Sequence, residues 1–430
     1  MPLPRPRSLL AAVLILLGST LACGSGDGGG ADPGAVDRML EFEPREVFAV
    51  GGVDARDWAT FGEVGDLGFD GDGNLYVFDD QAATITVVAP DGTFLRSFGR
   101  RGDGPGEIGQ PLAMTVFPDG RVAIADLGKR GVVLFDAQGE WLGNVPVEMA
   151  TEGLPGPDMT AHPGGWVVSG QPLRLFMRDP ESEDEPTPEE RETRPVFLYP
   201  TEEGADAVEL YGAWDPPDPP SEDGTTLEAG GQGNRLSIRM APLQAFEPEL
   251  HLAVLGDGRV AVVDSTTYRI QLFDTSGART GVWSRPLGPT PVTDRIREME
   301  RERRLAELEG EGTGRIRLLG GGGGISFDQA QVQEAMRTRV EQMSFYPEIP
   351  VVSGIAADRS GRLWVERSGE LPGEEGPVDL LAEDGSYLGS FPPGSIGIPE
   401  AFGPGGRVAV LETDEMDVAT IRVLEIPTAR

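Results

Sequence analysis

A turn-plus-strand signature recurs along most of this 430-residue chain and constrains its fold more than any other feature. Each copy is an X-Gly pair followed by a short apolar strand, which is the strongest short-range hairpin signal because type I′ turns need positive φ. Three of the five intervals between successive copies span 45 to 47 residues, and the other two span 93 and 103. The six glycines that mark the copies are Gly73, Gly120, Gly165, Gly258, Gly361 and Gly406.

Four strands per unit and a period near 46 predict the blades of a β-propeller. A single four-stranded sheet of small apolar residues cannot cover both of its faces, so it stacks on neighbouring sheets around an axis. Six inner turns therefore predict an all-β, six-bladed β-propeller. The 93-residue interval leaves room for a degenerate seventh blade, but we interpret it as an insertion because no signature stands at its middle. Loops are expected at residues 178–195 and 215–233.

The two ends of the repeat region predict how the ring closes. The run Val47–Val50 followed by Gly51 and Gly52 resembles the outer strand of a unit, but no unit precedes it. The last unit contains only three strands, at about 401–403, 407–413 and 420–426. We expect the N-terminal strand to complete this last blade, which removes a free sheet edge. The propeller is thus predicted to cover residues 45–427.

An insertion at about residues 291–346, between blades 4 and 5, is predicted to hold two helices. The first runs over Asp294–Glu309 after Thr293, a residue suited to an N-cap. The second runs over Asp328–Met343 and carries an apolar stripe that must rest on another surface. Two interpretations remain open for this pair: packing on the propeller rim, or a lid beside the mouth of the central channel.

The first 22 residues have the pattern of a signal peptide. Arg5 and Arg7 precede the apolar run Leu9–Leu17, which is too short to span a bilayer. The segment up to Cys23 resembles a bacterial lipoprotein signal, and that resemblance implies cleavage before Cys23 and lipidation of this residue. Because no Asp follows Cys23, it also implies an outer-membrane destination, facing the periplasm or the surface. Residues 23–44 are expected to be a flexible tether; ordinary secretion is the alternative.

The repeats themselves resemble a known group. The run Asn74–Asp79, the turn at 87–92 and the loop 97–108 look like NHL-type repeats, as does the later stretch Tyr268–Asp274. Their order and spacing resemble the bacterial six-bladed β-propeller lipoproteins over about residues 45–427. The resemblance implies the fold and the membrane anchor, and it supplies no catalytic residues. Blade 3 departs from the pattern because Ser169 replaces the acid that ends the second strand elsewhere.

Composition excludes several functions. The formal net charge of −35 argues against nucleic acid as a partner, since phosphates must be neutralised by Lys and Arg. The single Cys excludes a disulfide framework, and the two histidines exclude a three-histidine zinc site. Basic partners and metal cations remain open. We expect a monomer.

Acidic residues recur at one place, the end of the second strand of a blade. As one interpretation they are turn-stabilising hydrogen-bond acceptors. The alternative rests on resemblance to six-bladed lactonases, which bind calcium through carboxylates at the channel mouth, and it implies a calcium-dependent lactonase or esterase. His162 and His251 stand at non-equivalent positions and are interpreted as structural. The five acids are Asp79, Asp126, Asp264, Glu366 and Glu412.

Arg100, Arg101 and Glu107 lie on the Gly-Pro-rich loop between blades 1 and 2 and are candidate binding residues. Arginine beside acid on an ordered loop recognises a carboxylate, a sugar or a partner, or else pairs with itself and stiffens the loop. No nucleophile elbow and no His-Glu-x-x-His motif occurs. The sequence therefore favours a membrane-anchored, extracytoplasmic module that binds or scaffolds a protein, a carbohydrate or another small ligand without a cofactor.

Overall fold

A computed structural model gives the fold. It describes residues 37–170, 172–173, 193–202, 204–216, 225–229, 236–240, 243–310, 329–414, 416 and 418–426. The predicted signal peptide and Cys23 lie outside these residues.

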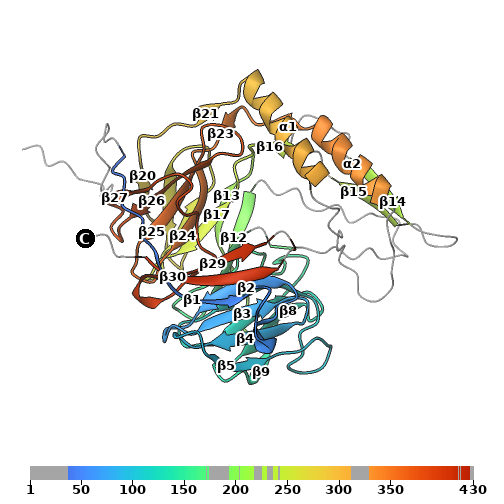
Figure 1. Ribbon diagram of the computed structural model, residues 1–430, viewed down its shortest axis with the longest axis vertical. Helices are drawn as coiled ribbons and strands as arrows, with labels where there is room; N and C mark the ends of the chain where they lie inside the picture. Colours follow the sequence, from blue (N-terminus) through green and yellow to red (C-terminus); the bar gives the residue numbers. More distant parts are fainter. Residues whose placement is uncertain are drawn as a thin grey trace, which may run out of the picture.

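Six four-stranded antiparallel sheets form the blades of a β-propeller (Figure 1). Blade 1 contains β2 (Val64–Phe69), β3 (Leu75–Asp79), β4 (Thr84–Val88) and β5 (Phe94–Phe98). Blade 2 contains β6 (Pro111–Val116), β7 (Val122–Asp126), β8 (Gly131–Phe135) and β9 (Trp141–Pro146). Blade 3 contains β10 (Thr160–Ala161), β11 (Val167–Gly170), β12 (Thr193–Tyr199) and β13 (Val208–Trp214).

The second half of the ring follows the same order. Blade 4 contains β17 (His251–Val254), β18 (Val260–Val263), β19 (Arg269–Phe273) and β20 (Arg279–Ser284). Blade 5 contains β24 (Val352–Ala357), β25 (Leu363–Ser368), β26 (Glu375–Leu381) and β27 (Tyr387–Phe391). Blade 6 contains β28 (Ala401–Phe402), β29 (Arg407–Thr413), β30 (Ala419–Glu425) and, from the other end of the chain, β1 (Arg45–Gly51). Two short 3-10 helices, η1 (Asp57–Ala59) and η2 (Pro404–Gly406), flank the sheets.

The N-terminal strand closes the ring as the sequence predicts. β1 pairs antiparallel with β30, with Val50 opposite Ile421 and Arg45 opposite Glu425. Gly51, the last residue of β1, has φ +94°, and a Cβ there would lie 2.4 Å from the backbone oxygen of Ala419 on β30. Only glycine therefore fits at this end of the strand pair.

The core lies between neighbouring blades. The two middle strands of a blade are buried on both faces, as β3, β4, β7 and β8 illustrate. Between blades 1 and 2, the side chains of Tyr76, Ile85, Ile124 and Val133 are at most 2% exposed. The glycines of all six inner turns have φ between +78° and +86°, which is the conformation that the X-Gly signal predicts.

The 93-residue interval is an insertion and not a seventh blade in the part of the chain that the structure describes. β12 and β13 complete blade 3, so the added chain falls between its second and third strands and after its fourth. The expected loop at 178–195 lies mostly outside the described residues, and its last three residues begin β12. The expected loop at 215–233 was partly wrong, because β14 (Thr225–Ala229) pairs there with β15 (Leu236–Met240).

The insertion between blades 4 and 5 contains the two predicted helices, α1 (Asp294–Gly310) and α2 (Gln329–Glu341). The hydroxyl of Thr293 accepts a hydrogen bond from the Ile296 amide, as an N-cap does. Two two-stranded sheets, β16 (Gln244–Ala245) with β22 (Ser344–Phe345) and β21 (Thr290–Pro291) with β23 (Glu348–Ile349), join the helices to the ring. Figure 1 places α1 and α2 side by side at one end of the molecule, opposite blades 1 and 2. Among the described residues, no helix is both long and apolar enough to cross a bilayer.

The start of the described chain corrects the predicted tether of residues 23–44, because Asp37–Leu40 dock on blade 5. The amide of Leu40 donates to the Ser390 carbonyl at 2.8 Å, and the Ser390 amide donates to the Arg38 carbonyl at 2.8 Å. Leu40 is buried beside Trp364 and Phe391. The predicted tether rests on the Gly-rich run 24–30, whereas residues 37–40 contact the outer strand of blade 5. We refer to residues 37–40 as the N-terminal clasp.

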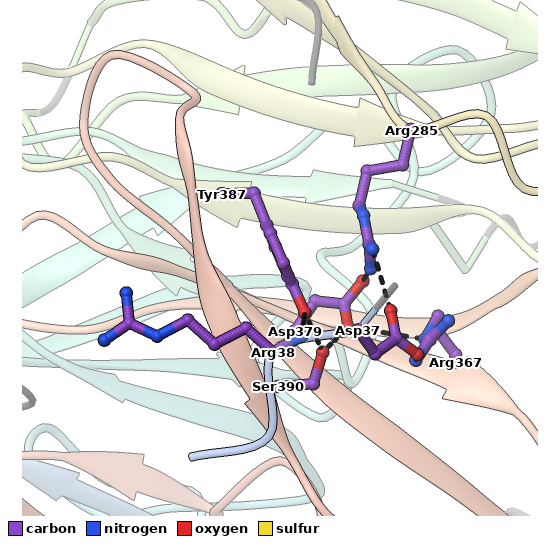
Figure 2. Close-up of polar contacts among 7 residues, drawn as sticks. All are labelled: Asp37, Arg38, Arg285, Arg367, Asp379, Tyr387 and Ser390. Carbon is purple, nitrogen blue, oxygen red and sulfur yellow. Dashed lines mark hydrogen bonds and ion pairs between the residues drawn. The ribbon is translucent and has the colours of Figure 1, made fainter. Parts of the chain in front are cut away.

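Two arginines hold the clasp, as Figure 2 shows. The Asp37 carboxylate accepts hydrogen bonds from Arg285 at 2.8 Å and from Arg367 at 2.5 Å. Burial alone would raise the pKa of Asp37, but the hydrogen bonds from the two guanidinium groups lower it below its ordinary value. The clasp therefore ties the N-terminus to the seam between blades 4 and 5.

Asp379 is the fully buried centre of this network. Its carboxylate accepts hydrogen bonds at 2.6 Å from Arg285 and from the Ser390 hydroxyl, and it lies 3.3 Å from Nε of Arg367. The Arg285 guanidinium also lies over the Tyr387 ring, 3.9 Å from its centroid. A buried charge network of this kind is very sensitive to the loss of one member, because the remaining charges are left uncompensated.

Replacing Asp379 by Asn should lower the free energy of unfolding by about 3 kcal/mol, since two buried guanidinium groups lose their central counter-charge. Urea denaturation followed by tryptophan fluorescence measures this change. Glu43→Gln, an exposed acid beside the clasp, serves as the matched control and should lie within about 0.5 kcal/mol of the wild type. Equal stability of the two variants would contradict the structural role assigned to Asp379.

Candidate functional site

Three of the five predicted acids accept hydrogen bonds from other segments of the chain and hold those segments in place. Asp79 accepts from the amides of Gly62 at 2.8 Å and Ala82 at 3.0 Å. Asp126 occupies the equivalent place in blade 2 and accepts from the amides at positions 109, 110 and 129. Asp264 accepts from the Trp214 amide at 3.0 Å and from the Tyr211 hydroxyl at 2.9 Å. Asp79 and Asp126 thus fix the loops that enter their blades, whereas Asp264 fixes the outer strand of blade 3, β13.

Blade 3 keeps this interaction although its second strand ends in Ser169. The Ser169 hydroxyl donates to the Asp158 carboxylate at 2.6 Å, and the Gly170 amide donates to the same carboxylate at 2.7 Å. Asp158 belongs to the loop that enters blade 3. In blade 3 the loop supplies the acceptor carboxylate, and the end of the second strand supplies the donor hydroxyl. Donor and acceptor are therefore exchanged relative to blades 1 and 2.

The other two predicted acids differ from the first three and from each other. Glu412 is exposed and accepts a hydrogen bond from Arg422 at 2.8 Å on the neighbouring strand. Glu366 is partly buried, lines the central channel, and makes no hydrogen bond or ion pair within the described part of the chain. Across the residues that the structure describes, no three His, Cys, Asp or Glu side chains are grouped so as to hold a metal ion. The structure does not bring the five acids together.

The candidate binding residues of the loop between blades 1 and 2 pair within that loop. Arg100 donates to Glu107 at 2.8 Å, and the same carboxylate accepts from the Gly104 amide at 2.8 Å. Arg101 donates to the carbonyl oxygens of Gly109 at 2.9 Å and Asp80 at 2.5 Å. These contacts match the self-pairing alternative, in which the residues stiffen the loop.

The two histidines have different environments. His162 accepts from the Gly164 amide at 2.9 Å through Nδ1, and its Nε2 lies 2.8 Å from the Gly258 carbonyl, which fixes the neutral tautomer and joins the inner turns of blades 3 and 4. His251 lies where β17 enters the channel. Burial, aided by the charge of Arg194, lowers the pKa of His251 to about 4, so its ring is neutral at pH 7.

The innermost strands of the six blades line a channel of about 740 Å³. Its wall combines polar and apolar side chains, and Leu67, Met114, Leu252 and Ile355 are among the apolar ones. Five acidic residues also line it, and burial raises the pKa of four of them. Asp66 has the largest shift, to about 6, and accepts a hydrogen bond from the Met114 amide at 2.8 Å. The other three are Asp158, Glu366 and Glu400.

A second cavity, of about 850 Å³, lies at the end of the channel where the innermost strands begin. Leu250, His251 and Glu366 line both this cavity and the channel. We call it the mouth cavity. One wall is the segment 366–376 of blade 5, and another comes from α1 through Glu300, Arg303 and Arg304. The helical insertion therefore lies beside the channel mouth, which is where the lid interpretation placed it.

The apolar stripe of α2 has a different partner. Val340 and Met343 pack against Ala245, Leu305 and Phe345, which belong to β16, α1 and β22. α2 thus supports α1 and does not itself line the mouth cavity. Of the two helices, α1 contributes described side chains to the mouth cavity and α2 does not.

Three residues that line the mouth cavity each have a buried side-chain atom without a hydrogen-bond partner: Nη2 of Arg194, Oε1 of Gln244 and Nε of Arg367. Nε of Arg367 still lies 3.3 Å from the Asp379 carboxylate, whereas the other two atoms have no such neighbour. Arg194 is only 9% exposed, and its other nitrogens donate to the carbonyls of Trp214 and Pro248 at 2.9 Å. A buried polar atom without a partner destabilises a fold by about 1–3 kcal/mol, so each such atom needs an explanation. Sequence analysis missed Arg194, and no local pattern marks it, since Arg191 precedes it by only three residues.

Comparison with known proteins supports the fold class only. No protein-family model and no curated protein matches the chain. A gluconolactonase from Xanthomonas campestris is 16% identical, with 92% of this chain and 99% of that chain covered and a TM-score of 0.36. A candidate exported protein from Bacteroides fragilis is 11% identical, with 92% and 98% covered and a TM-score of 0.46. The calcium-binding protein regucalcin from Agrobacterium tumefaciens is 14% identical, with 91% and 97% covered and a TM-score of 0.37. The gluconolactonase and regucalcin are six-bladed β-propellers.

Replacing Asp66 by Asn should stabilise the protein in a pH-dependent manner. The folded-state pKa of Asp66, about 6, lies above the unfolded value of 3.8, so its ionisation penalty grows as pH rises through this interval. Asn keeps the acceptor for the Met114 amide and carries no charge. We expect a gain of about 2 kcal/mol in the free energy of unfolding at pH 7.5 and about half of that at pH 5. Asp72→Asn, on an exposed turn, is the control; a pH-independent gain would contradict the burial of Asp66 as its cause.

Proposed function

We propose that this protein is an extracytoplasmic binding module whose ligand occupies the mouth cavity. The observation that most supports this proposal concerns Arg194 and Gln244. Both residues line a cavity of about 850 Å³, and each has a buried side-chain atom without a hydrogen-bond partner. A donor and an acceptor left open in one cavity suit a ligand that completes both hydrogen bonds. The carboxylates of Asp79, Asp126 and Asp264 are already occupied by donors of the fold, so they offer no competing site.

The helical insertion fits this role. α1 extends the wall of the mouth cavity beyond the ring of blades, and ion pairs among its own residues stiffen it. A deep polar cavity on a rigid scaffold gives specificity through preorganised contacts. A partner protein that inserts a side chain or a free small molecule both suit a cavity of this size.

The proposed address is the outer membrane, through acyl chains on Cys23. Several acyl chains hold a protein stably on a membrane where one chain does not. The proposal rests on the sequence, namely the apolar run Leu9–Leu17 and the single cysteine that follows it. A membrane-held propeller with net charge −35 would meet basic or neutral partners outside the cytoplasm.

Ligand binding at the mouth cavity is tested with Ser353→Trp, because Ser353 is exposed on β24 and lines the cavity, so an indole there fills it. Thermal unfolding of wild type and variant is measured with amino acids, sugars, short peptides and organic acids. A binding ligand stabilises the native state by about 2.7 kcal/mol at a hundredfold excess over Kd, so we expect a clear rise in Tm for the wild type and none for the variant. Equal shifts in both proteins would contradict the site.

The second candidate, a calcium-dependent lactonase or esterase at the channel, is favoured by one observation: Glu366 reaches the channel without a partner. The same measurement tests it when calcium is compared with magnesium at equal concentration. A calcium-specific rise in Tm together with hydrolysis of lactones or aryl esters would replace the binding module by the hydrolase. Equal effects of both cations without hydrolysis would support the binding module.

The anchor is tested by Cys23→Ser, which removes the only thiol that could carry acyl chains. We expect the wild-type protein to sediment with membranes and the variant to appear in the soluble extracytoplasmic fraction. Fractionation followed by immunoblotting measures the distribution. Unchanged sedimentation of the variant would contradict lipidation.

A further inference from the structure

The cations of α1 are not available to a ligand in the mouth cavity. Glu300, which is 2% exposed, accepts hydrogen bonds from Arg303 at 2.8 Å and from Arg304 at 2.6 Å. Arg303 also contacts Glu307. The charges of the two arginines are thus neutralised by acids of the same helix. The charge of Arg367 is neutralised by Asp37 and Asp379.

Two acids of the mouth cavity have no such compensation. Glu366 and Glu375 line the cavity and make no hydrogen bond or ion pair within the described residues. Glu366 is the more buried of the two, and burial and the nearby charge of Glu375 raise its pKa. Two uncompensated carboxylates that repel each other at the edge of a cavity are stabilised by a bound cation.

The position of Glu366 differs by one residue from that of the acids in blades 1 and 2. Glu366 pairs with Gly354 as Phe78 pairs with Asp66, and Arg367 occupies the place of Asp79. The acids of blades 1 and 2 are bound by amides of the loop that enters the blade, whereas no amide of the described residues donates to Glu366. Gly354 and Gly397 lie next to the Glu366 carboxylate. A Cβ at these positions would lie 3.4 Å and 3.3 Å from its oxygens, so the two glycines leave space around the group.

A cation alone does not complete the cavity, because Nη2 of Arg194 still needs an acceptor and Oε1 of Gln244 a donor. An amide or carboxyl oxygen satisfies the first atom, and an N–H group satisfies the second. The acids around Arg194, among them Asp215 at 3.8 Å, already balance its charge, so a neutral carbonyl suffices there. The complementary ligand carries a cationic end and a peptide-like end.

From this complementarity we propose that the mouth cavity binds a basic amino-acid residue, an arginine or lysine side chain with its adjoining peptide amides, presented by a peptide or a partner protein. The inference rests on the proposed function and specifies its ligand class. Glu366, with Glu375, receives the cationic group, and Arg194 and Gln244 receive the backbone amides. The overall charge of −35 attracts such ligands toward the molecule, and salt weakens this attraction.

The test compares N-acetyl-L-arginine amide with N-acetyl-L-citrulline amide, which has nearly the same shape but an uncharged urea in place of the guanidinium. Isothermal titration calorimetry with the full-length protein measures both affinities. We expect the arginine compound to bind at least tenfold more tightly. Glu366→Gln should reduce its affinity at least tenfold. Glu383→Gln, the matched loss of one exposed acid in blade 5 at the opposite end of the strands, should leave it within twofold.

Three outcomes would overturn the proposal. Equal affinity for the two compounds would exclude a cation-selective site. Equal losses in Glu366→Gln and Glu383→Gln would mean that only the overall charge attracts the ligand. Unchanged binding to Ser353→Trp would place the compound outside the mouth cavity. If instead only uncharged compounds bind, and Ser353→Trp abolishes that binding, the proposed function stands and the ligand class alone is wrong.

Discussion

The burial of blade faces is the constraint on which the rest of the structure depends. A four-stranded sheet whose middle strands are apolar on both faces, such as β3 and β4 in blade 1, is stable only between two other sheets. Stacking around an axis supplies both neighbours, but only if the ring closes. Closure is achieved by β1 in blade 6, and the N-terminal clasp extends the same end of the chain onto blade 5. The first described residues thus hold two of the six blades.

The periodic parts of this architecture could be predicted from the sequence. Six turns with positive-φ glycine, the apolar strands behind them and a near-constant spacing determined the number of blades, and a strand without a unit of its own predicted the closure. The clasp has no comparable signal in the sequence, because Asp37 and Leu40 contact residues more than 240 positions away. Interactions at such separations follow from the closed ring, and local patterns do not contain them.

The candidate site was predicted only in part, for a related reason. The repeat predicted Glu366 as one of a set of equivalent acids, and the strand register shows that this was wrong by one residue, since Arg367 occupies the place of Asp79. A shift of one residue places a side chain on the other face of a sheet, so Glu366 does not meet the amides that bind Asp79 and Asp126. Arg194 was missed because its partners, Trp214 and Pro248, lie 20 and 54 residues further along the chain. Its unpartnered atom becomes visible only when the cavity exists.

Repetition and departure from it have different roles in this molecule. In blades 1 and 2 the acid at the end of the second strand fixes the short loop before the blade, and the serine of blade 3 is matched by Asp158 from the other side. Blade 5 departs from this pattern, because Arg367 stands where blades 1 and 2 carry the acid and pairs with Asp37 and Asp379. Glu366, one residue earlier, lines the channel and the mouth cavity, and the insertion before blade 5 brings α1 to the same cavity. A changed strand end and one long insertion thus give a symmetric scaffold one distinct site.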